Sequence, residues 1–379
     1  MNVASVSWGD HLAFGEGDGR LATPDAVARR LVRWRRELGA GALHWRLLRT
    51  RIPGRFQAAR GYRHPSQSTA AALGWDDLVE VPALAHAAGL DAWLYVSVFD
   101  EGWPLAPSAT RRVSYHNAMH GRHVAWQSEL TRAHPQWLAA DHTGRRRQWG
   151  VVSLGYAAAR RAFAARWRAL LAGTRFDGLF LCLRSQSRPP AHADEFGYNR
   201  PVRPRGPFDP GAWRAAQGCA LTALLEELRP MLAADGRRLG VGVARGDVLG
   251  PPLGNGTLEW RTWLRRGLVD QLVIDQNSSQ CPSMWHPLWP MHRGTGYLQN
   301  YLDGTGLPPL VEHVREVYAP AARAAGAELV VARQWQPRER GVERRLLSTP
   351  GVSGLAFSTF RHDNPAAVAR NDWRAGRIR

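Results

Sequence analysis

Carboxylates, guanidiniums and amides directly follow most of the short apolar runs in this sequence. Hydrolysis of a glycosidic bond needs a proton donor and a second carboxylate, about 5 Å apart for retention and about 6.5–9.5 Å apart for inversion. Asp275 is the first candidate because it immediately follows the apolar run 272–274. Asp100 and Glu101 follow the apolar run 92–98 and are the candidates for the second carboxylate. For Asp275, the alternative is a carboxylate paired with a neighbouring arginine, and for Asp100 and Glu101 it is a solvated loop position.

The same positions carry side chains suited to binding a sugar. Guanidinium forks bind carboxylates and other oxygen acceptors with geometric specificity, and aromatic faces pack against apolar surfaces such as the C–H face of a sugar ring. The candidate substrate-binding residues are Trp8, Asp10, His11, Trp45, Arg46, Arg184, Gln186, Arg245, Asp247, Gln276, Asn277, Arg333, Trp335 and Arg361. We predict that three of these arginines, Arg184, Arg245 and Arg333, point toward a common pocket.

Alternating apolar runs and helical patterns must position these residues. Such alternation is typical of a parallel sheet built from βα units. The predicted strands cover residues 3–8, 42–46, 92–98, 178–183, 239–243, 269–274, 328–332 and 352–358. The predicted helices begin near residues 23, 76, 156, 210, 258, 308, 338 and 365. The first of them opens at Thr23-Pro24-Asp25, where a cap residue precedes a proline and an early acid.

Eight strands in one chain favour the α/β class and a closed (β/α)8 TIM barrel, formed as a single domain over residues 1–379. An open doubly wound sheet would offer a glycine-rich nucleotide loop after its first strand, and Gly9-Asp10-His11 is not one. Long loops are expected after strands three, four and six. Active sites of this barrel lie at the carboxyl ends of the strands, so the candidate residues should share one end of the molecule.

The charge of the chain has two explanations that the sequence leaves open. The 379 residues include 50 basic residues, all of them arginine, against 32 acidic residues, which gives a net charge of +18. A GC-rich coding bias would enrich arginine without any functional cause. The other explanation is attraction to an anionic ligand, such as an acidic glycan. A nucleic-acid partner is less favoured, because the arginines are spread along the chain and no binding motif occurs.

Metals, cofactors and membranes have little support in the sequence. His116, His120 and His123 have a helical spacing, but no H-E-x-x-H motif accompanies them, so we expect no metal and no cofactor. Only three cysteines occur, without C-x-x-C spacing. No apolar run approaches the roughly 20 residues of a membrane span. No signal peptide precedes the first strand, which indicates a cytoplasmic protein if the chain is full length and a periplasmic or secreted one if a leader was removed. The oligomeric state stays open.

Several stretches resemble the family-10-like glycosyl hydrolase barrels of bacteria. His134-Pro135-Gln136-Trp137 with Asp141 and Gly144 is similar to their HPEW…D.dG loop, and Phe176-Asp177-Gly178 is similar to the start of their fourth strand. The segments 260–270 and 194–199 resemble two further motifs. The resemblance covers most of the chain and implies a glycoside-hydrolase-like TIM barrel that acts on a poly- or oligosaccharide. The arginines expected to line the pocket would favour an acidic or heavily hydroxylated sugar.

The fourth predicted strand departs from the usual glycosidase pattern. Chitinase-like barrels end this strand with D-G-x-x-x-D-x-E, whereas this chain has Cys182 and Arg184 at the two later carboxylate positions. Hydrolysis would then have to use carboxylates from other strands. The alternative is a non-catalytic glycan-binding barrel that has lost the carboxylate of strand four.

Overall fold

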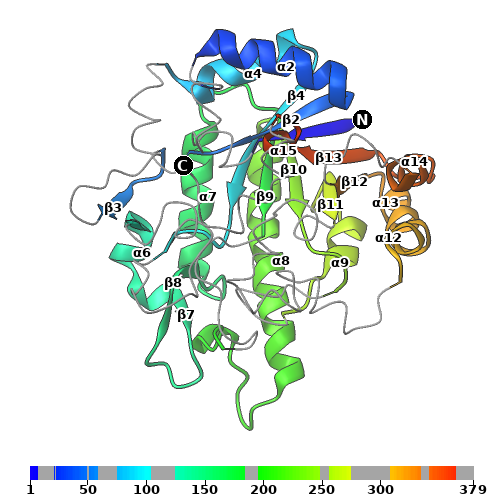
Figure 1. The fold of residues 1–379 in the computed structure, drawn as a ribbon. Helices are drawn as coiled ribbons and strands as arrows, with labels where there is room; N and C mark the ends of the chain where they lie inside the picture. The colour runs from blue at the N-terminus through cyan, green and yellow to red at the C-terminus, as the bar shows by residue number, and fades with distance from the viewer. Residues whose placement is uncertain are drawn as a thin grey trace, which may run out of the picture.

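A computed structural model describes residues 1–6, 21, 23–48, 51–58, 75–103, 124–183, 195–247, 256–274, 308–333 and 341–363. Within this part of the chain, eight parallel strands close into a barrel in the order β1-β13-β12-β11-β10-β9-β4-β2 (Figure 1). Their bounds are Asn2–Ser5 for β1, Ala40–Arg46 for β2, Asp91–Ser97 for β4, Gly178–Cys182 for β9, Arg238–Gly242 for β10, Gln271–Ile274 for β11, Glu328–Arg333 for β12 and Gly354–Ser358 for β13. The predicted closed (β/α)8 barrel is confirmed.

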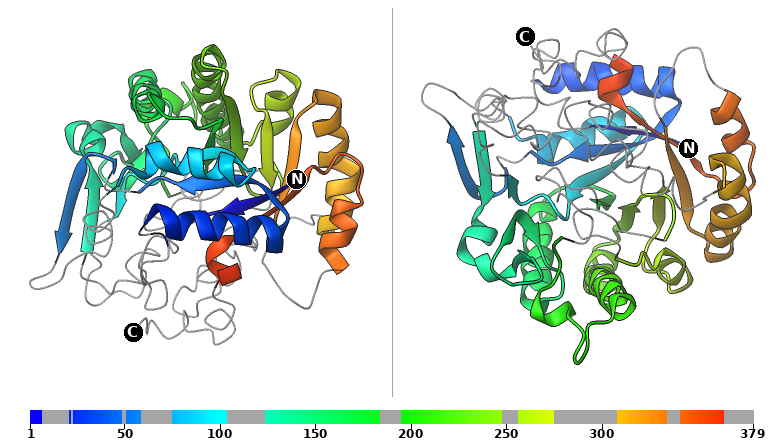
Figure 2. Two further views of the ribbon diagram at one scale, coloured as in Figure 1. Left: turned by 90° about the horizontal axis from the view of Figure 1, so that it is seen from above. Right: turned by 60° about the horizontal axis from the view of Figure 1, so that its bottom comes forward.

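Helices surround the barrel on its outer side, as the end-on views show (Figure 2). They are α2 (Pro24–Leu38), α4 (Asp77–Ala87), α7 (Ala157–Leu171), α8 (Pro210–Ala234), α9 (Trp260–Arg265), α12 (Leu310–His313), α13 (Ala319–Ala325), α14 (Gly341–Leu347) and α15 (Thr359–Asp363). The Thr23 side chain caps α2 by accepting a hydrogen bond from the backbone of Ala26, and Gly39 ends the helix with φ +62°. None of the described helices is long and apolar enough to cross a membrane.

The helix predicted from residue 308 is interrupted rather than continuous. A π-helical segment, Val314–Tyr318, separates α12 from α13. Pro320 stands in the first turn of α13 and has no backbone N–H to donate. The missing donor at Pro320 accounts for the wider π-helical turn that precedes α13.

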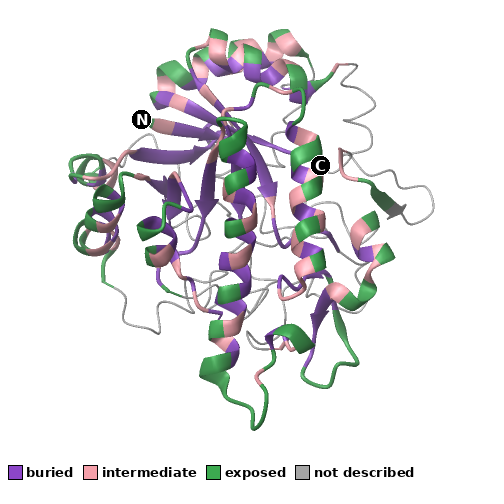
Figure 3. Cartoon of the chain, turned by 180° about the vertical axis from the view of Figure 1, so that it is seen from behind, coloured by how far each residue is buried: buried purple, intermediate pink, exposed green. Residues whose placement is uncertain are grey.

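The barrel strands are mostly buried (Figure 3), and their side chains alternate between two apolar layers. In β2, Leu43 and Trp45 belong to the large cluster between strands and helices, whereas Ala42 belongs to the smaller cluster inside the barrel. Trp93 fills the interior because glycines stand opposite it. A Cβ atom at Gly178 would lie 2.5 Å from the Trp93 ring, and one at Gly240 would lie 3.2 Å from it.

The long loops carry structure that the sequence did not predict. A three-stranded sheet joins β3 (Gly54–Ala58), β6 (Val124–Ser128) and β5 (Gly102–Trp103), and a second sheet pairs β7 (Leu138–Ala140) with β8 (Arg147–Val152). The β3–β6 pairing connects the loop after β2 with the loop after β4. A five-residue helix, α6 (Glu129–Ala133), follows β6. These segments add to the barrel at the carboxyl ends of its strands.

Candidate functional site

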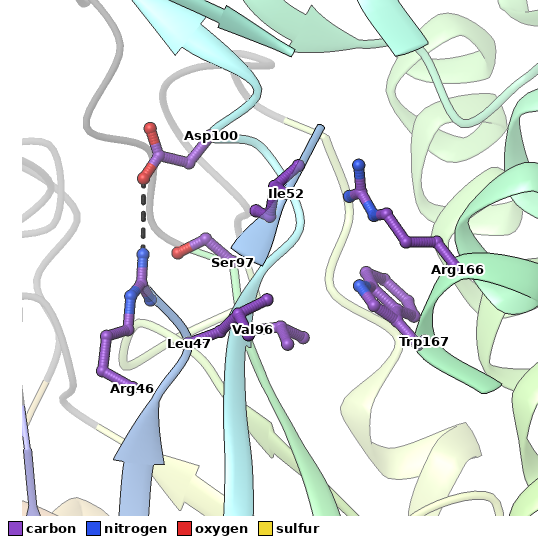
Figure 4. A pocket seen from close by; sticks show the side chains of 8 residues that line it. All are labelled: Arg46, Leu47, Ile52, Val96, Ser97, Asp100, Arg166 and Trp167. Atoms are coloured by element: carbon purple, nitrogen blue, oxygen red, sulfur yellow. Dashed lines mark hydrogen bonds and ion pairs between the residues drawn. The ribbon is translucent and has the colours of Figure 1, made fainter. Parts of the chain in front are cut away.

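A buried ion pair lies at the carboxyl end of the barrel interior. Arg46 ends β2 on the face that points into the barrel, and its guanidinium lies 4.5 Å from the centre of the Tyr95 ring. The same guanidinium donates to Asp100, just beyond β4, over 3.3 Å (Figure 4). The side chains are 4% and 0% exposed. Asp100 and Arg46, both candidate site residues, are therefore brought together by the ends of neighbouring strands, and the guanidinium favours the ionised carboxylate.

A small cavity lies beside this pair, on its helix-facing side. Its volume is about 10 Å³, close to the minimum for a single water molecule. The lining residues are Arg46, Leu47, Ile52, Val96, Ser97, Asp100, Arg166 and Trp167. Figure 4 shows Arg46 and Asp100 on one side of this cavity and the α7 residues Arg166 and Trp167 on the other. The cavity has room for water but not for a sugar ring.

Glu101 is held differently from its neighbour Asp100. Both carboxylate oxygens of Glu101 accept hydrogen bonds from the Arg166 guanidinium, one of them at 2.9 Å, and the Glu101 side chain is 1% exposed. Its backbone N–H donates to Gly150, and its carbonyl accepts from Ser128. Glu101 thus joins α7 to the strands of the inserted loop. This bidentate arrangement is that of a structural ion pair, which favours Asp100 over Glu101 as the reacting acid.

The middle of the barrel contains a polar chain that the sequence did not single out. His44 is buried, stacks on Phe180 with ring centres 4.0 Å apart, and contacts the Gln271 amide oxygen through Nε2 at 2.9 Å. The Gln271 amide nitrogen donates to Glu328 over 2.8 Å, and Glu328 pairs with Arg238. Because the amide oxygen can only accept, His44 must be protonated at Nε2. Burial lowers the pKa of His44 to about 3, and the hydrogen bond to Gln271, which acts to raise the pKa, offsets only part of this effect.

His44 should make the stability of the fold depend on pH. Below its ordinary pKa of 6.5 the unfolded chain binds a proton at His44 that the folded chain does not bind until about pH 3. Stability is therefore lost as pH falls through this window, by about 1.4 kcal/mol per pH unit well below the unfolded pKa. In urea titrations between pH 7 and pH 4, His44→Gln should remove that part of the slope. His142→Gln, at an exposed position, is the control and should leave the slope unchanged; an equal slope in wild type and His44→Gln would contradict the assignment.

The predicted convergence of three arginines is not supported by the described residues. Arg245, after β10, donates to the carbonyl oxygen of Pro308 over 2.6 Å. Arg333, at the end of β12, pairs with Glu343 of α14 at 3.0 Å. Its neighbour Ala332 faces the barrel interior, so alternation turns Arg333 toward the helices. Arg184 lies outside the described residues.

Two other candidates have structural partners. Trp45 is 1% exposed in the layer between strands and helices, where its indole N–H donates to Asp77 over 3.0 Å. This position does not fit a sugar-stacking role, because β2 presents alternate residues to opposite layers and Trp45 faces the outer one. Asp247 accepts from the Trp260 indole and from Arg261, both at 2.7 Å, and its side chain is 56% exposed.

The remaining candidates cannot be placed. Asp275, Trp8, Asp10, His11, Gln186, Gln276, Asn277 and Trp335 lie outside the described residues, as do His116, His120 and His123; Arg361 lies in α15, but its side chain is not described. Among the described residues, no group of three or more His, Cys, Asp or Glu could hold a metal ion. The roles proposed for these candidate residues stay predictions.

The motifs that resembled a glycosyl hydrolase family are structural where they are described. Asp141 accepts hydrogen bonds from Thr143 and from the backbone and side chain of Arg146, closing the β7–β8 turn. Burial acts to raise the pKa of Asp141, but these hydrogen bonds to its carboxylate outweigh burial and hold the pKa below its ordinary value. Asp177 accepts from the backbone of Ala92 and contacts His86, at the amino end of the barrel. Short motifs of this kind fix turns and strand starts rather than reacting groups.

Comparisons with known proteins support the fold. No protein-family model matches the sequence, and no curated protein matches it. The chain is similar to the PgaB (BpsB) glycoside hydrolase domain of Bordetella bronchiseptica, at 13% identity and a TM-score of 0.53, over 98% of both chains. It is also similar to a β-galactosidase from the psychrophilic Marinomonas ef1, at 12% identity and a TM-score of 0.50, covering 94% of this chain and 54% of that one. At these identities, the similarity shows that the chain shares the TIM-barrel fold and shows nothing finer.

Proposed function

We propose that this protein is a glycoside hydrolase that cleaves O-glycosidic bonds of a poly- or oligosaccharide at the carboxyl ends of the barrel strands. The observation that carries the proposal is the buried Asp100 carboxylate, held by Arg46 at the end of the neighbouring strand β2. The fold shared with the glycoside hydrolase domain of PgaB supports the same reading. We also propose that the chain belongs to a branch of the family-10-like glycosyl hydrolases.

The proposed chemistry uses two carboxylates from separate strands. Asp100, kept ionised by Arg46, serves as general base or nucleophile, and Asp275, which follows β11 in the sequence, serves as proton donor. In the barrel, β9 and β10 lie between β4 and β11, so the two acids would approach a sugar from different sides of the barrel opening. The proton donor must have a raised pKa, which a drier and apolar surrounding would provide. No cofactor is required for this reaction.

The carboxyl end of β9, which is the fourth barrel strand along the chain, favours a second candidate function. β9 ends at Cys182, which belongs to the interior cluster and lies in register with Ser97 of β4 and Gly242 of β10. None of these three described residues offers the carboxylate that chitinase-like barrels carry there. A non-catalytic barrel that binds a glycan would have the same end of β9, and it is the alternative to the hydrolase.

A panel of polysaccharides distinguishes the two functions. Neutral, N-acetylated and acidic polysaccharides would each be incubated with the full chain, and new reducing ends would be counted alongside binding measured by calorimetry. We expect reducing ends to appear from at least one member of the panel. Binding without new reducing ends would replace the hydrolase with the glycan-binding barrel, and the absence of both would overturn the proposal.

A further inference from the structure

Two neighbouring aromatic rings, those of Phe208 and Tyr198, lie outside the barrel on a loop at the carboxyl ends of its strands. Phe208 is 47% exposed, and its ring lies 5.7 Å from that of Tyr198. Tyr198 stacks almost parallel on the buried Trp213 of α8, with ring centres 4.6 Å apart and planes 11° apart. The Trp213 indole N–H donates to the carbonyl of Gly197 over 2.9 Å. The exposed Phe208 ring and the half-buried Tyr198 ring therefore rest on a buried base.

The segment that carries Tyr198 is also tied to the β7–β8 hairpin. The N–H groups of Gly197 and Tyr198 both donate to the carbonyl of Ala140, at 2.9 and 3.0 Å. The Asn199 amide bridges the same strand, accepting from Ala140 and donating to Leu138. Gly197 has φ +112°, and a Cβ there would lie 2.3 Å from the Gln217 amide, so the position requires glycine. The hairpin and the aromatic rings thus form one rigid surface.

Exposed arginines occur on the two segments that build this surface, the β7–β8 hairpin and residues 195–209. We call the whole surface the outer rim: it comprises Tyr198, Phe208 and the exposed residues Arg145, Arg147, Arg200, Arg203 and Arg205. None of these arginines forms an ion pair with another described residue. The acids nearby are already engaged, because Glu195 pairs with Arg146 and Asp209 caps α8 by accepting from Gly211. The outer rim therefore presents unneutralised guanidiniums beside flat aromatic faces.

The outer rim lies at the end of the molecule where the proposed active site opens. The β7–β8 hairpin follows β4, and residues 195–209 lead from β9 to α8, so both belong to loops at the carboxyl ends of strands. Figures 1 and 3 show the hairpin and the start of α8 together at the lower end of the molecule. A polymer held at the barrel opening could continue across this surface.

We propose that the outer rim is a second binding site for the chain of an acidic polysaccharide, with Phe208 and Tyr198 stacking on sugar rings and the arginines binding carboxylate or sulfate groups. This inference rests on the proposed function and names its substrate class. A neutral glycan would use the rings but not the guanidiniums. A single-stranded nucleic acid would use both, but a glycan is favoured because the outer rim lies at the same end of the barrel as the proposed glycan site.

Binding measurements on the full chain test this inference. An oligogalacturonate long enough to extend from the barrel opening would be titrated calorimetrically in the Asp275→Asn background, so that binding is read without cleavage. We expect Phe208→Ala to weaken binding by about three- to tenfold. Arg203→Gln with Arg205→Gln should weaken it by about tenfold at low salt and by less at high salt, because surface charges are screened. The same substitutions should change the affinity for the galacturonate dimer only a little.

Matched controls lie on α14, far from the outer rim in Figure 1. Arg344→Gln with Arg345→Gln makes the same change in charge, and Leu347→Ala removes another exposed apolar side chain. The controls should leave binding unchanged, and thermal unfolding should show that every variant folds. Unchanged binding in the rim variants, or equally tight binding of a neutral dextran, would overturn the inference even if hydrolysis is observed. Tighter binding of single-stranded DNA than of the oligogalacturonate, with the same sensitivity to the rim variants, would assign the surface to nucleic acid instead.

Discussion

Replacing Asp275 with asparagine is expected to lower kcat for glycan hydrolysis by about 10²–10⁴-fold, the usual contribution of a general acid or base. Asparagine has nearly the size of aspartate but cannot donate a proton from a carboxyl group, so folding and binding should persist. Asp100→Asn should cause a loss of similar size, because the second carboxylate acts in the same step. Initial rates of reducing-end formation, measured with saturating glycan, would give both values.

Asp235→Asn is the matched control for these two variants. Asp235 follows α8 at the opposite end of the barrel, and its side chain is 52% exposed. The control should retain wild-type kcat and KM. Full activity of Asp275→Asn would remove this residue from the mechanism, and full activity of Asp100→Asn would transfer the role of second carboxylate to another acid.

Arg166→Met is expected to destabilise the fold by about 3–5 kcal/mol, because it would leave the Glu101 carboxylate buried without its two guanidinium donors. The double variant Arg166→Met with Glu101→Leu should recover much of this loss, since it removes both members of the pair and buries no charge. Urea unfolding at neutral pH would measure both free energies. The double variant should also keep hydrolytic activity, because the proposed mechanism assigns the second carboxylate to Asp100 and leaves Glu101 as the ion-pair partner of α7.

Arg132→Met provides the comparison for an exposed ion pair. Arg132 and Glu129 are 28% and 56% exposed, and removing such a pair should change the free energy of unfolding by less than about 1 kcal/mol. A loss as small as this in Arg166→Met would show that the buried pair does not stabilise the fold. Loss of turnover in a folded double variant would instead return Glu101 to the list of reacting acids.

The barrel could be predicted from sequence because its signals are local. Short stretches rich in apolar residues coincide with strands such as β4 and β9, and the capping residues Thr23 and Gly39 mark both ends of α2. The β3–β6 sheet could not be predicted, because it pairs residues 54–58 with residues 124–128. Neither segment alone carries a pattern strong enough to indicate a strand.

The candidate site was predicted in part. The rule that barrel sites lie at the carboxyl ends of strands placed Arg46 and Asp100 at the same end of the barrel, where the structure pairs them, and their roles in a site stay predictions. It could not tell which acid of the pair Asp100 and Glu101 points toward the barrel, because adjacent residues beyond a strand diverge according to loop geometry. The strand alternation that turns Trp45 and Arg333 toward the helices was visible in the sequence as a period of two. It would have separated them from inward residues such as His44.

The measurement that tests the central claim most directly is hydrolysis in ¹⁸O-labelled water. The full chain would be incubated with the polysaccharide that yields new reducing ends, and the products would be analysed by mass spectrometry. Hydrolysis of the glycosidic bond transfers one oxygen of water to the anomeric carbon, so each new reducing end should carry a single ¹⁸O, and Asp275→Asn should give almost none. Products without the label, or a glycan that binds and is recovered intact, would contradict the assignment of this barrel as a glycoside hydrolase.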